Sequence, residues 1–153
     1  MRSNALAVVV DSGPLLAVAL RRDQAHELAA SLIDYGGRDL LIPDPVVTEC
    51  DDFLRRRDAH EGARRLLDAL VAGVWIRVPL QPTLFAQAVA IDAHYRDLGL
   101  GLVDASVMAV AASTGSAILT FDFGHFRAAP PLSGGAWDLV IDESDYIKAV
   151  RAR

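Results

Sequence analysis

The sequence predicts an α/β domain with a largely parallel central sheet, and two observations support this. Short runs rich in β-branched residues alternate with longer segments of helical periodicity, a pattern typical of strands joined by crossover helices. The chain has 153 residues, 52% of them hydrophobic, which suffices for one core but not for two ordinary domains. We therefore expect one domain over residues 1–153, with four to five parallel strands flanked by helices.

The first elements follow from an apolar run and a turn. Residues 7–10 are continuously apolar, which predicts a buried strand. Gly13-Pro14 then turns the chain, and helical patterns follow over residues 15–20 and 24–35.

The middle of the chain predicts two strands and two helices between them. Residues 40–42 form the second strand, and Asp44 is an N-cap followed by proline at the first helical position. Helices are expected over residues 46–57 and 61–71, and a third strand over residues 74–78.

The last third of the chain repeats the alternation. Pro82 opens a helix to about residue 97, and residues 103–113 are apolar nearly all round, which predicts a buried helix. Strands are expected over residues 117–121 and 137–141, and a charged helix begins at about Ser144.

The charge balance argues against binding of nucleic acid through a broad basic surface, because the formal net charge is −5. If metal ions neutralise the four acids discussed below, the remaining net charge is −1. Arginine clusters could then supply local phosphate contacts, although each is by default a solvated helix face. These clusters are Arg21-Arg22, Arg55-Arg56-Arg57 and Arg64-Arg65.

Membrane and disulfide features are not expected. The longest apolar run, residues 5–20, is interrupted by Asp11 and is shorter than the roughly 20 residues that span a bilayer, so we expect no membrane segment and no cleavable signal. Cys50 is the single cysteine, and no Cys/His pair has zinc-finger spacing. This usage indicates a reducing cytoplasm, with Cys50 as a core residue rather than a nucleophile.

Two carboxylates stand in apolar surroundings, where an ionised group costs several kcal/mol unless a cation or strong donors compensate it. Asp11 is the only charge between Arg2 and Arg21, and Asp104 is the only charge between Asp97 and Asp122. Ligands in open α/β sheets bind beyond the carboxyl ends of the strands. Asp11 and Asp122 each follow a strand at that edge.

Glu49 is a third candidate, and Asp104 completes a set of four. At about 100° per residue, Glu49 lies roughly 40° from Phe53 on the edge of an apolar helix face. Asp104 is expected in the first turn of the buried helix, where helix N–H groups favour a carboxylate. Converging acids of this kind require hard divalent cations, and Mg²⁺ or Mn²⁺ suits carboxylates and water as ligands.

Ordinary structural roles compete with this interpretation. Asp11 and Asp104 could each cap a helix, and Asp122 could be a turn residue before Gly124. Ser12 and Thr120 are expected to be local hydrogen-bonding residues. The position of His125 close to Asp122 draws attention, but we do not predict it as a ligand.

The segments that carry the four acids together resemble the PIN-domain family, and in particular the VapC-type toxins of bacterial toxin–antitoxin pairs. AVVVDSGPLLA is similar to the family's opening strand with its first acid, Asp11, and VVTECDDFL is similar to the helix with the second, Glu49. GLVDASVMAVAASTGSAILTFDFGHF resembles the segment with the third acid, Asp104, and the final strand with Thr120, Asp122, His125 and Phe126. The resemblance spans residues 8–141.

The resemblance implies helices around a parallel sheet, dependence on Mg²⁺ or Mn²⁺, and endonucleolytic cleavage of RNA. It also implies a cognate antitoxin that inhibits the enzyme, and a homodimer formed through helices. The expected ligands are Asp11, Asp104 and Asp122, while Glu49 either completes the metal shell or orients the attacking water.

Two alternative functions remain open. A non-catalytic module with this fold would use its acidic groove to dock a basic partner peptide. An Asp-based phosphoryl-transfer domain would use Asp11 as nucleophile, but such sites usually need a nearby lysine, and the sole lysine is Lys148 in the C-terminal helix.

Overall fold

The computed structural model describes residues 7–34 and 37–152. Its strands are β1 (Val8–Val10), β2 (Leu40–Pro43), β3 (Ile76–Val78) and β4 (Ala117–Leu119). Its helices are α1 (Ser12–Ala19), α2 (His26–Asp34), α3 (Asp44–Arg56), α4 (His60–Val71), α5 (Pro82–His94), the short 3₁₀ helix η1 (Arg96–Leu98), α6 (Gly101–Thr114), α7 (Phe123–Ala128) and α8 (Glu143–Arg151). Residues 5 and 6 of the apolar run and residue 35 of the helix expected over 24–35 lie outside the described residues.

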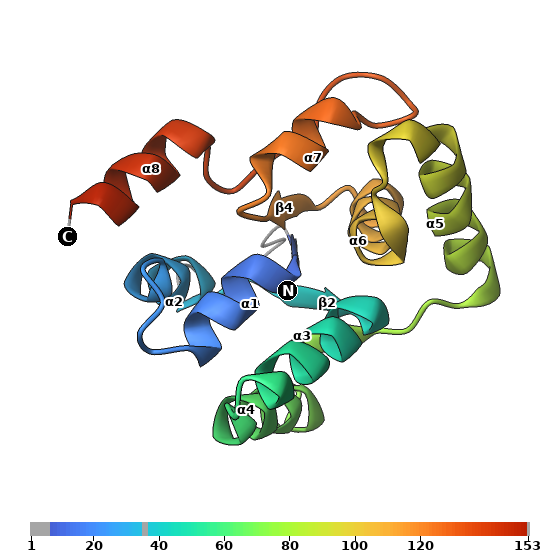
Figure 1. The fold of residues 1–153 in the computed structure, drawn as a ribbon. Helices are drawn as coiled ribbons and strands as arrows, with labels where there is room; N and C mark the ends of the chain where they lie inside the picture. The colour runs from blue at the N-terminus through green and yellow to red at the C-terminus, as the bar shows by residue number, and fades with distance from the viewer. Residues whose placement is uncertain (1–6, 35–36, 153) are drawn as a thin grey trace.

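The four strands form one parallel sheet in the order β3-β2-β1-β4, which confirms the predicted fold class. Figure 1 shows helices on both sides of this sheet, with α1 and α2 on one side and α5 and α6 on the other. Strands β1, β2 and β4 are largely buried, as parallel strands joined by crossover helices usually are, whereas the edge strand β3 is mostly exposed. Val9, Ile42 and Ile118 have no exposed surface and form the centre of the core.

A fifth strand does not form, so the lower end of the predicted range is correct. Residues 137–141 contribute a single parallel bridge, between Leu139 and Ile118. The N–H of Ile118 donates to Asp138, and the N–H of Val140 donates to Ile118. The pairing then stops, because Asp142 accepts from the N–H of Asp145 and starts α8.

Helix boundaries depart from the prediction by a few residues. Asp44 is the first residue of α3 rather than its cap, and its carboxylate lies 3.4 Å from Arg77 on β3. The helix expected to run to residue 97 ends at His94, because the chain passes through η1 and then Gly99, which has a φ of +61°. Helix α7 was not predicted.

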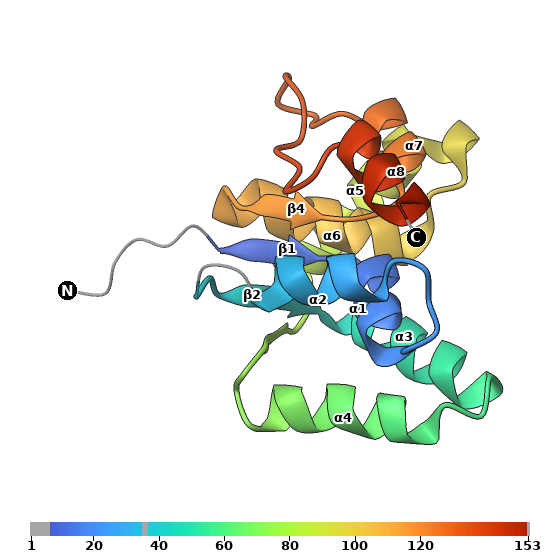
Figure 2. The ribbon, with the colours of Figure 1, turned by 90° about the vertical axis from the view of Figure 1, so that its left-hand side faces the viewer.

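The helices that directly follow a strand all start at the same edge of the sheet, because its strands are parallel. Figure 2 shows the strands running in one direction, with α1 and α3 starting at the carboxyl edge. Helix α6 packs against β1, β2 and β4. Within the described residues, no helix has the length and apolar character needed to cross a bilayer.

Candidate metal centre

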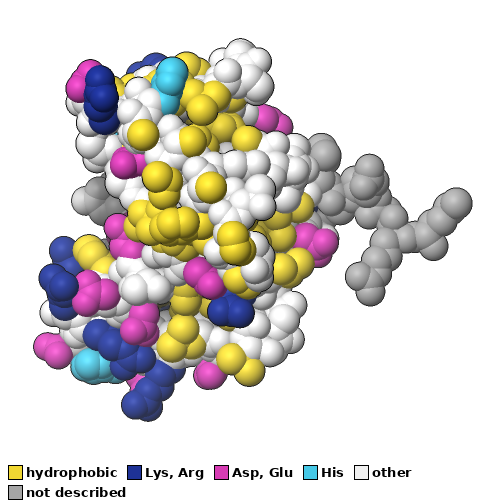
Figure 3. Space-filling view, turned by 90° about the vertical axis from the view of Figure 1, so that its right-hand side faces the viewer, with side chains coloured by type: hydrophobic (Ala, Val, Ile, Leu, Met, Phe, Trp, Pro, Cys, Tyr) yellow, Lys and Arg dark blue, Asp and Glu magenta, His cyan; other side chains and the backbone are white. Residues whose placement is uncertain are grey.

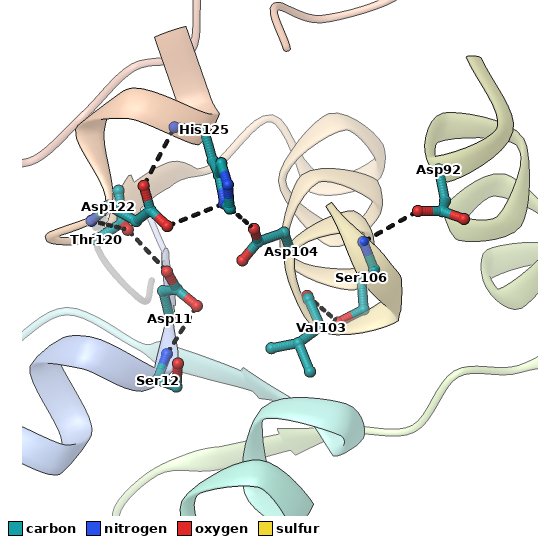
Figure 4. A network of polar contacts seen from close by, with 10 residues as sticks. Asp11, Ser12, Asp92, Val103, Asp104, Ser106, Thr120, Asp122 and His125 are labelled. Carbon is teal, nitrogen blue, oxygen red and sulfur yellow. Dashed lines mark hydrogen bonds and ion pairs between the residues drawn. The ribbon is translucent and has the colours of Figure 1, made fainter. Parts of the chain in front are cut away.

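Asp11 directly follows β1 and is only 4% exposed. Its Oδ1 accepts a hydrogen bond from the N–H of Ser12 at 2.8 Å, and its Oδ2 accepts one from the Thr120 hydroxyl at 2.7 Å (Figure 4). Burial raises the pKa of Asp11 from 3.8 to about 6, and the charges of Asp104 and Glu49 add to the rise. The two hydrogen bonds oppose that rise without cancelling it. An ionised Asp11 is therefore costly in the absence of a cation.

Asp104 lies in the first turn of α6, as predicted, and its side chain is 14% exposed. Nδ1 of His125 lies 2.6 Å from Asp104 Oδ2 and donates to it when the carboxyl is ionised. Burial raises the pKa of Asp104 above its usual range, and the contact with His125 opposes this rise. Asp104 does not cap α6. The N-cap position belongs to Leu100, whose side chain makes no capping hydrogen bond.

Asp122 lies three residues beyond β4 and starts α7. Its Oδ1 accepts from the N–H of His125 at 3.2 Å, so Asp122 caps α7, whereas the sequence suggested only a turn residue before Gly124. Its Oδ2 lies 2.9 Å from Nδ1 of the same histidine. One ring nitrogen therefore contacts both Asp104 and Asp122, as Figure 4 shows.

Glu49 reaches the same place from α3, but its side chain is exposed. Its negative charge contributes to the raised pKa values of Asp11 and Asp104, so it lies near both. The two acids that follow it pair along α3 instead, Asp51 with Arg55 and Asp52 with Arg56. Neither Asp51 nor Asp52 lines the cavity that the other acids share.

The four predicted acids line one cavity of about 700 Å³ at the carboxyl edge of the sheet. Its other walls come from the residues around the start of α1, from the start of α6 and from the segment after β4: Ser12, Gly13, Leu100, Gly101, Leu102, Val103, Phe121 and His125. Elements distant in the sequence thus bring their carboxylates to one open pocket.

Two residues contribute more than the sequence indicated. Thr120, 1% exposed, donates to Asp11 and accepts from the N–H of Asp122 at 3.0 Å, so it fixes two predicted ligands at once. His125 was left outside the predicted set, yet its ring joins Asp104 and Asp122. The only hint of these roles in the sequence was that Thr120 and His125 lie within three residues of Asp122.

Cys50 is fully buried, which confirms its prediction as a core residue. Burial raises the pKa of its thiol, with Glu49 and Asp11 adding to the effect, so the thiolate needed for nucleophilic chemistry is disfavoured. Its Sγ lies 3.8 Å from the carbonyl oxygen of Ser12 and ties α3 to α1 beneath the pocket.

The donor set fits a divalent cation. Within the described residues, Asp104, Asp122 and His125 each present one ligand atom, and these atoms lie within 4.8 Å of one another. Asp11 and Glu49 add carboxylates from the same cavity. Carboxylate oxygens with an imidazole nitrogen are a ligand set that divalent metals accept, and neutralisation by a cation would remove the cost of the buried charge.

A parallel α/β sheet with an acidic pocket at its carboxyl edge defines the structural class of the protein. The description of the matching family model is PIN domain, and the match covers residues 8–130. The chain therefore belongs to the PIN-domain family.

Individual relatives extend this comparison over most of the chain. The chain is 27% identical over 134 residues to Ribonuclease VapC26 of Mycobacterium tuberculosis, a match that covers 87% of the chain and 99% of that protein. The crystal structure of VapC20 from the same organism, a toxin that cleaves the sarcin–ricin loop, superposes with a TM-score of 0.69 at 21% identity, covering 78% of this chain and 94% of VapC20. VapBC2 from Rickettsia felis, bound to a promoter DNA fragment, gives a TM-score of 0.61 at 11% identity, covering 83% and 96%. The two structural similarities establish the fold alone.

Proposed function

We propose that the chain is a metal-dependent endoribonuclease that uses Mg²⁺ or Mn²⁺ to cleave RNA phosphodiester bonds. The observation that carries the proposal is the pocket in which the buried Asp11 shares a cavity with Asp104, Asp122 and Glu49. Such a site is unfavourable unless a cation compensates the acids, and phosphodiester hydrolysis is chemistry that clustered acids and divalent cations perform.

Each acid has a role in this proposal. Asp11, Asp104 and Asp122 hold the metal, and Glu49 either completes the shell or orients the attacking water for in-line attack on phosphorus. Thr120 holds the Asp11 carboxylate in one orientation through its 2.7 Å hydrogen bond. When bound, a divalent cation would neutralise the carboxylates and the charge that develops on the phosphate oxygens.

The relatives support the reaction and its substrate. The relative that shares 27% identity over nearly its whole length is named a ribonuclease. A structural neighbour with the same sheet is described as a toxin that cleaves the sarcin–ricin loop, which supports RNA as the substrate class.

The biological setting belongs to the same proposal. The resemblance to VapC-type toxins supports a cognate antitoxin, a homodimer and a cytoplasmic protein whose single domain covers residues 1–153. One face of the molecule offers an apolar surface for such a dimer, and Figure 3 shows hydrophobic atoms across its middle. Its exposed large apolar side chains include Phe85 and Val89 on α5 and Leu102 on α6. Light scattering on the purified protein tests the dimer, and a monomer mass would exclude it.

Incubation of the purified protein with RNA tests the reaction. We expect cleavage with Mn²⁺ or Mg²⁺, no cleavage with a chelator, and loss of activity in Asp11→Asn. RNA that stays whole under every condition would favour the non-catalytic binding module. The phosphoryl-transfer alternative predicts a covalent acyl-phosphate on Asp11, but no lysine lines the pocket, and Lys148 contacts Asp145 instead.

A further inference from the structure

The arginines in the three sequence clusters differ in what they contact. Arg55 lies 2.9 Å from Asp51, and Arg56 lies 3.0 Å from Asp52, so each is neutralised by a carboxylate one turn earlier on α3. These two arginines are therefore poor candidates for binding a further anion.

Three other arginines meet around the C-terminal end of α1. Arg22, in the α1–α2 connection, and Arg57, directly after α3, line the same cavity of about 490 Å³. Arg65, on α4, lines the adjoining groove with Ala19 of α1. All three are exposed, and none of them forms an ion pair with any residue that the structure describes.

The helices that carry this surface are in direct contact. A Cβ added at Gly62 on α4 would lie 3.2 Å from the carbonyl oxygen of Ala19, so α4 and the end of α1 approach closely. Figure 3 shows dark-blue side chains with magenta carboxylates among them at the lower end of the molecule, where α3 and α4 lie in Figure 1. The fold thus brings Arg22 and Arg57 to one cavity and Arg65 to a groove beside the same end of α1, although the three are separated in sequence.

Local contacts leave the positive charge of this surface available. The guanidinium of Arg57 lies 4.4 Å from the centre of the Phe53 ring, which orients its plane while leaving its N–H donors free. Asp23 lines the same cavity and its Oδ1 accepts from the N–H of Ala25 at 2.8 Å, so one carboxylate stands against the two guanidinium groups of Arg22 and Arg57 there. Asp58, the next acid along, lies 3.7 Å from a nitrogen of His60.

We propose that Arg22, Arg57 and Arg65, the arginine surface, bind the phosphate backbone of the RNA that the acidic pocket cleaves. This inference rests on the proposed ribonuclease function and adds where the substrate lies. Glu49 and Arg57 are eight residues apart along and just beyond α3, which corresponds to about 12 Å of helix. Along a strand with stacked bases, at about 3.4 Å per nucleotide, that distance covers three to four nucleotides.

An RNA strand is the partner that this surface fits, because it supplies phosphates at regular intervals away from a cleavage point. Unpaired guanidinium groups bind phosphate through two parallel hydrogen bonds. The overall charge of −5 disfavours RNA, so local arginines beside the pocket are needed to retain the strand.

Fluorescence anisotropy with a labelled 20-nucleotide single-stranded RNA tests the proposal. Both proteins carry Asp104→Asn to prevent cleavage, and the buffer contains Mn²⁺. One of them also carries Arg22→Gln and Arg57→Gln and is called the double variant below. We expect about tenfold weaker binding at 50 mM salt and a slope of log K against log salt reduced by about 1.4, or 0.7 for each lost phosphate contact. A labelled two-nucleotide RNA, too short to span the roughly 12 Å between Glu49 and Arg57, should bind equally to both proteins.

Arg38→Gln controls for the loss of one positive charge and is compared with half of the effect of the double variant, because Arg38 is exposed and precedes β2 at the opposite edge of the sheet. Circular dichroism checks that each variant folds. Unchanged affinity and slope in the double variant, or an equal loss in the control, would overturn the arginine surface. The arginine surface would also be overturned if the double variant bound RNA normally but no longer bound a polyglutamate peptide, because the surface would then bind an acidic protein segment instead.

Cleavage by the wild-type protein, measured in parallel, separates the two proposals. If it cuts RNA with Mn²⁺ while the double variant retains full RNA affinity, the arginine surface is wrong and the ribonuclease function stands. If it cuts no RNA, the ribonuclease function fails, and the arginine surface fails with it.

Discussion

Replacement of Asp11 by asparagine should stabilise the metal-free protein at neutral pH. In the folded protein the pKa of Asp11 is raised from 3.8 to about 6, chiefly by burial. At about 1.36 kcal/mol per pH unit between these values, ionisation of Asp11 costs the fold about 3 kcal/mol. An asparagine can keep only one of the two hydrogen bonds, from Ser12 and Thr120, and the lost one costs about 1 kcal/mol. The expected net gain at pH 7 is about 2 kcal/mol.

The sign of this difference should change with pH. Because the folded state holds the Asp11 proton more tightly than the unfolded chain, its contribution to stability is complete below pH 3.8 and is lost as the pH rises through about 6. Near pH 4, just above the pKa of the unfolded chain, the wild-type protein should therefore be more stable than Asp11→Asn by about 0.5 kcal/mol, because ionisation offsets only part of the hydrogen bond that the variant loses. Above pH 6 the variant should be the more stable protein.

Urea unfolding in EDTA at half-unit steps from pH 4 to pH 8, followed by tryptophan fluorescence, measures this difference. Asp68→Asn, which removes an exposed carboxylate on α4 outside the pocket, controls for the loss of one negative charge. A difference between Asp11→Asn and wild type that does not vary with pH would refute the reasoning. Mn²⁺ at 100 times its Kd should add about 2.7 kcal/mol to the wild-type protein and reverse the order at pH 7.

Two further substitutions test how the pocket is built. Thr120→Val removes the hydroxyl that joins Asp11 to the N–H of Asp122, so titration calorimetry should show Mn²⁺ affinity falling by about 10- to 100-fold. Thr120→Ser keeps a hydroxyl and should bind Mn²⁺ nearly as tightly as wild type. Equal affinities in all three proteins would show that Thr120 does not support the metal site. Asp44→Asn should leave Mn²⁺ affinity within about twofold and lower the free energy of unfolding by less than about 1 kcal/mol, because its contact with Arg77 is solvent-exposed. A large loss of Mn²⁺ binding in Asp44→Asn would show that the metal lies elsewhere.

The sequence predicted the fold well where apolar runs were continuous and turn or capping residues bounded them. The buried helix expected over residues 103–113 corresponds to α6, and the expected strands at residues 7–10 and 40–42 correspond to β1 and β2. It overpredicted at residues 137–141, because apolar composition alone cannot show that only Leu139 meets a partner strand. It missed α7, a helix of six residues, since so short an element leaves no periodic pattern.

The acids of the candidate site were predictable, whereas the groups that orient them were not. A carboxylate in an apolar run is conspicuous, so Asp11 and Asp104 could be selected from composition and position alone. The role of Thr120 depends on β1 and β4 being neighbours, a pairing between residues 109 positions apart in the chain. The contact of His125 with Asp104 depends likewise on how α7 lies against α6, which no local pattern records.

Strand order explains why some strand-end acids face the pocket and another does not. Asp44 follows β2 as directly as Asp11 follows β1, so the position of an acid after a strand does not distinguish them. The chain leaves β1 toward β2 on one side and reaches β4 on the other, which makes the end of β1 the point where the strand order reverses. A crevice opens at such a point because the connections on either side lead away from each other. The acids after β1 and β4 flank that crevice, whereas Asp44 lies beyond it, in the neighbouring groove beside Phe85 and Leu102.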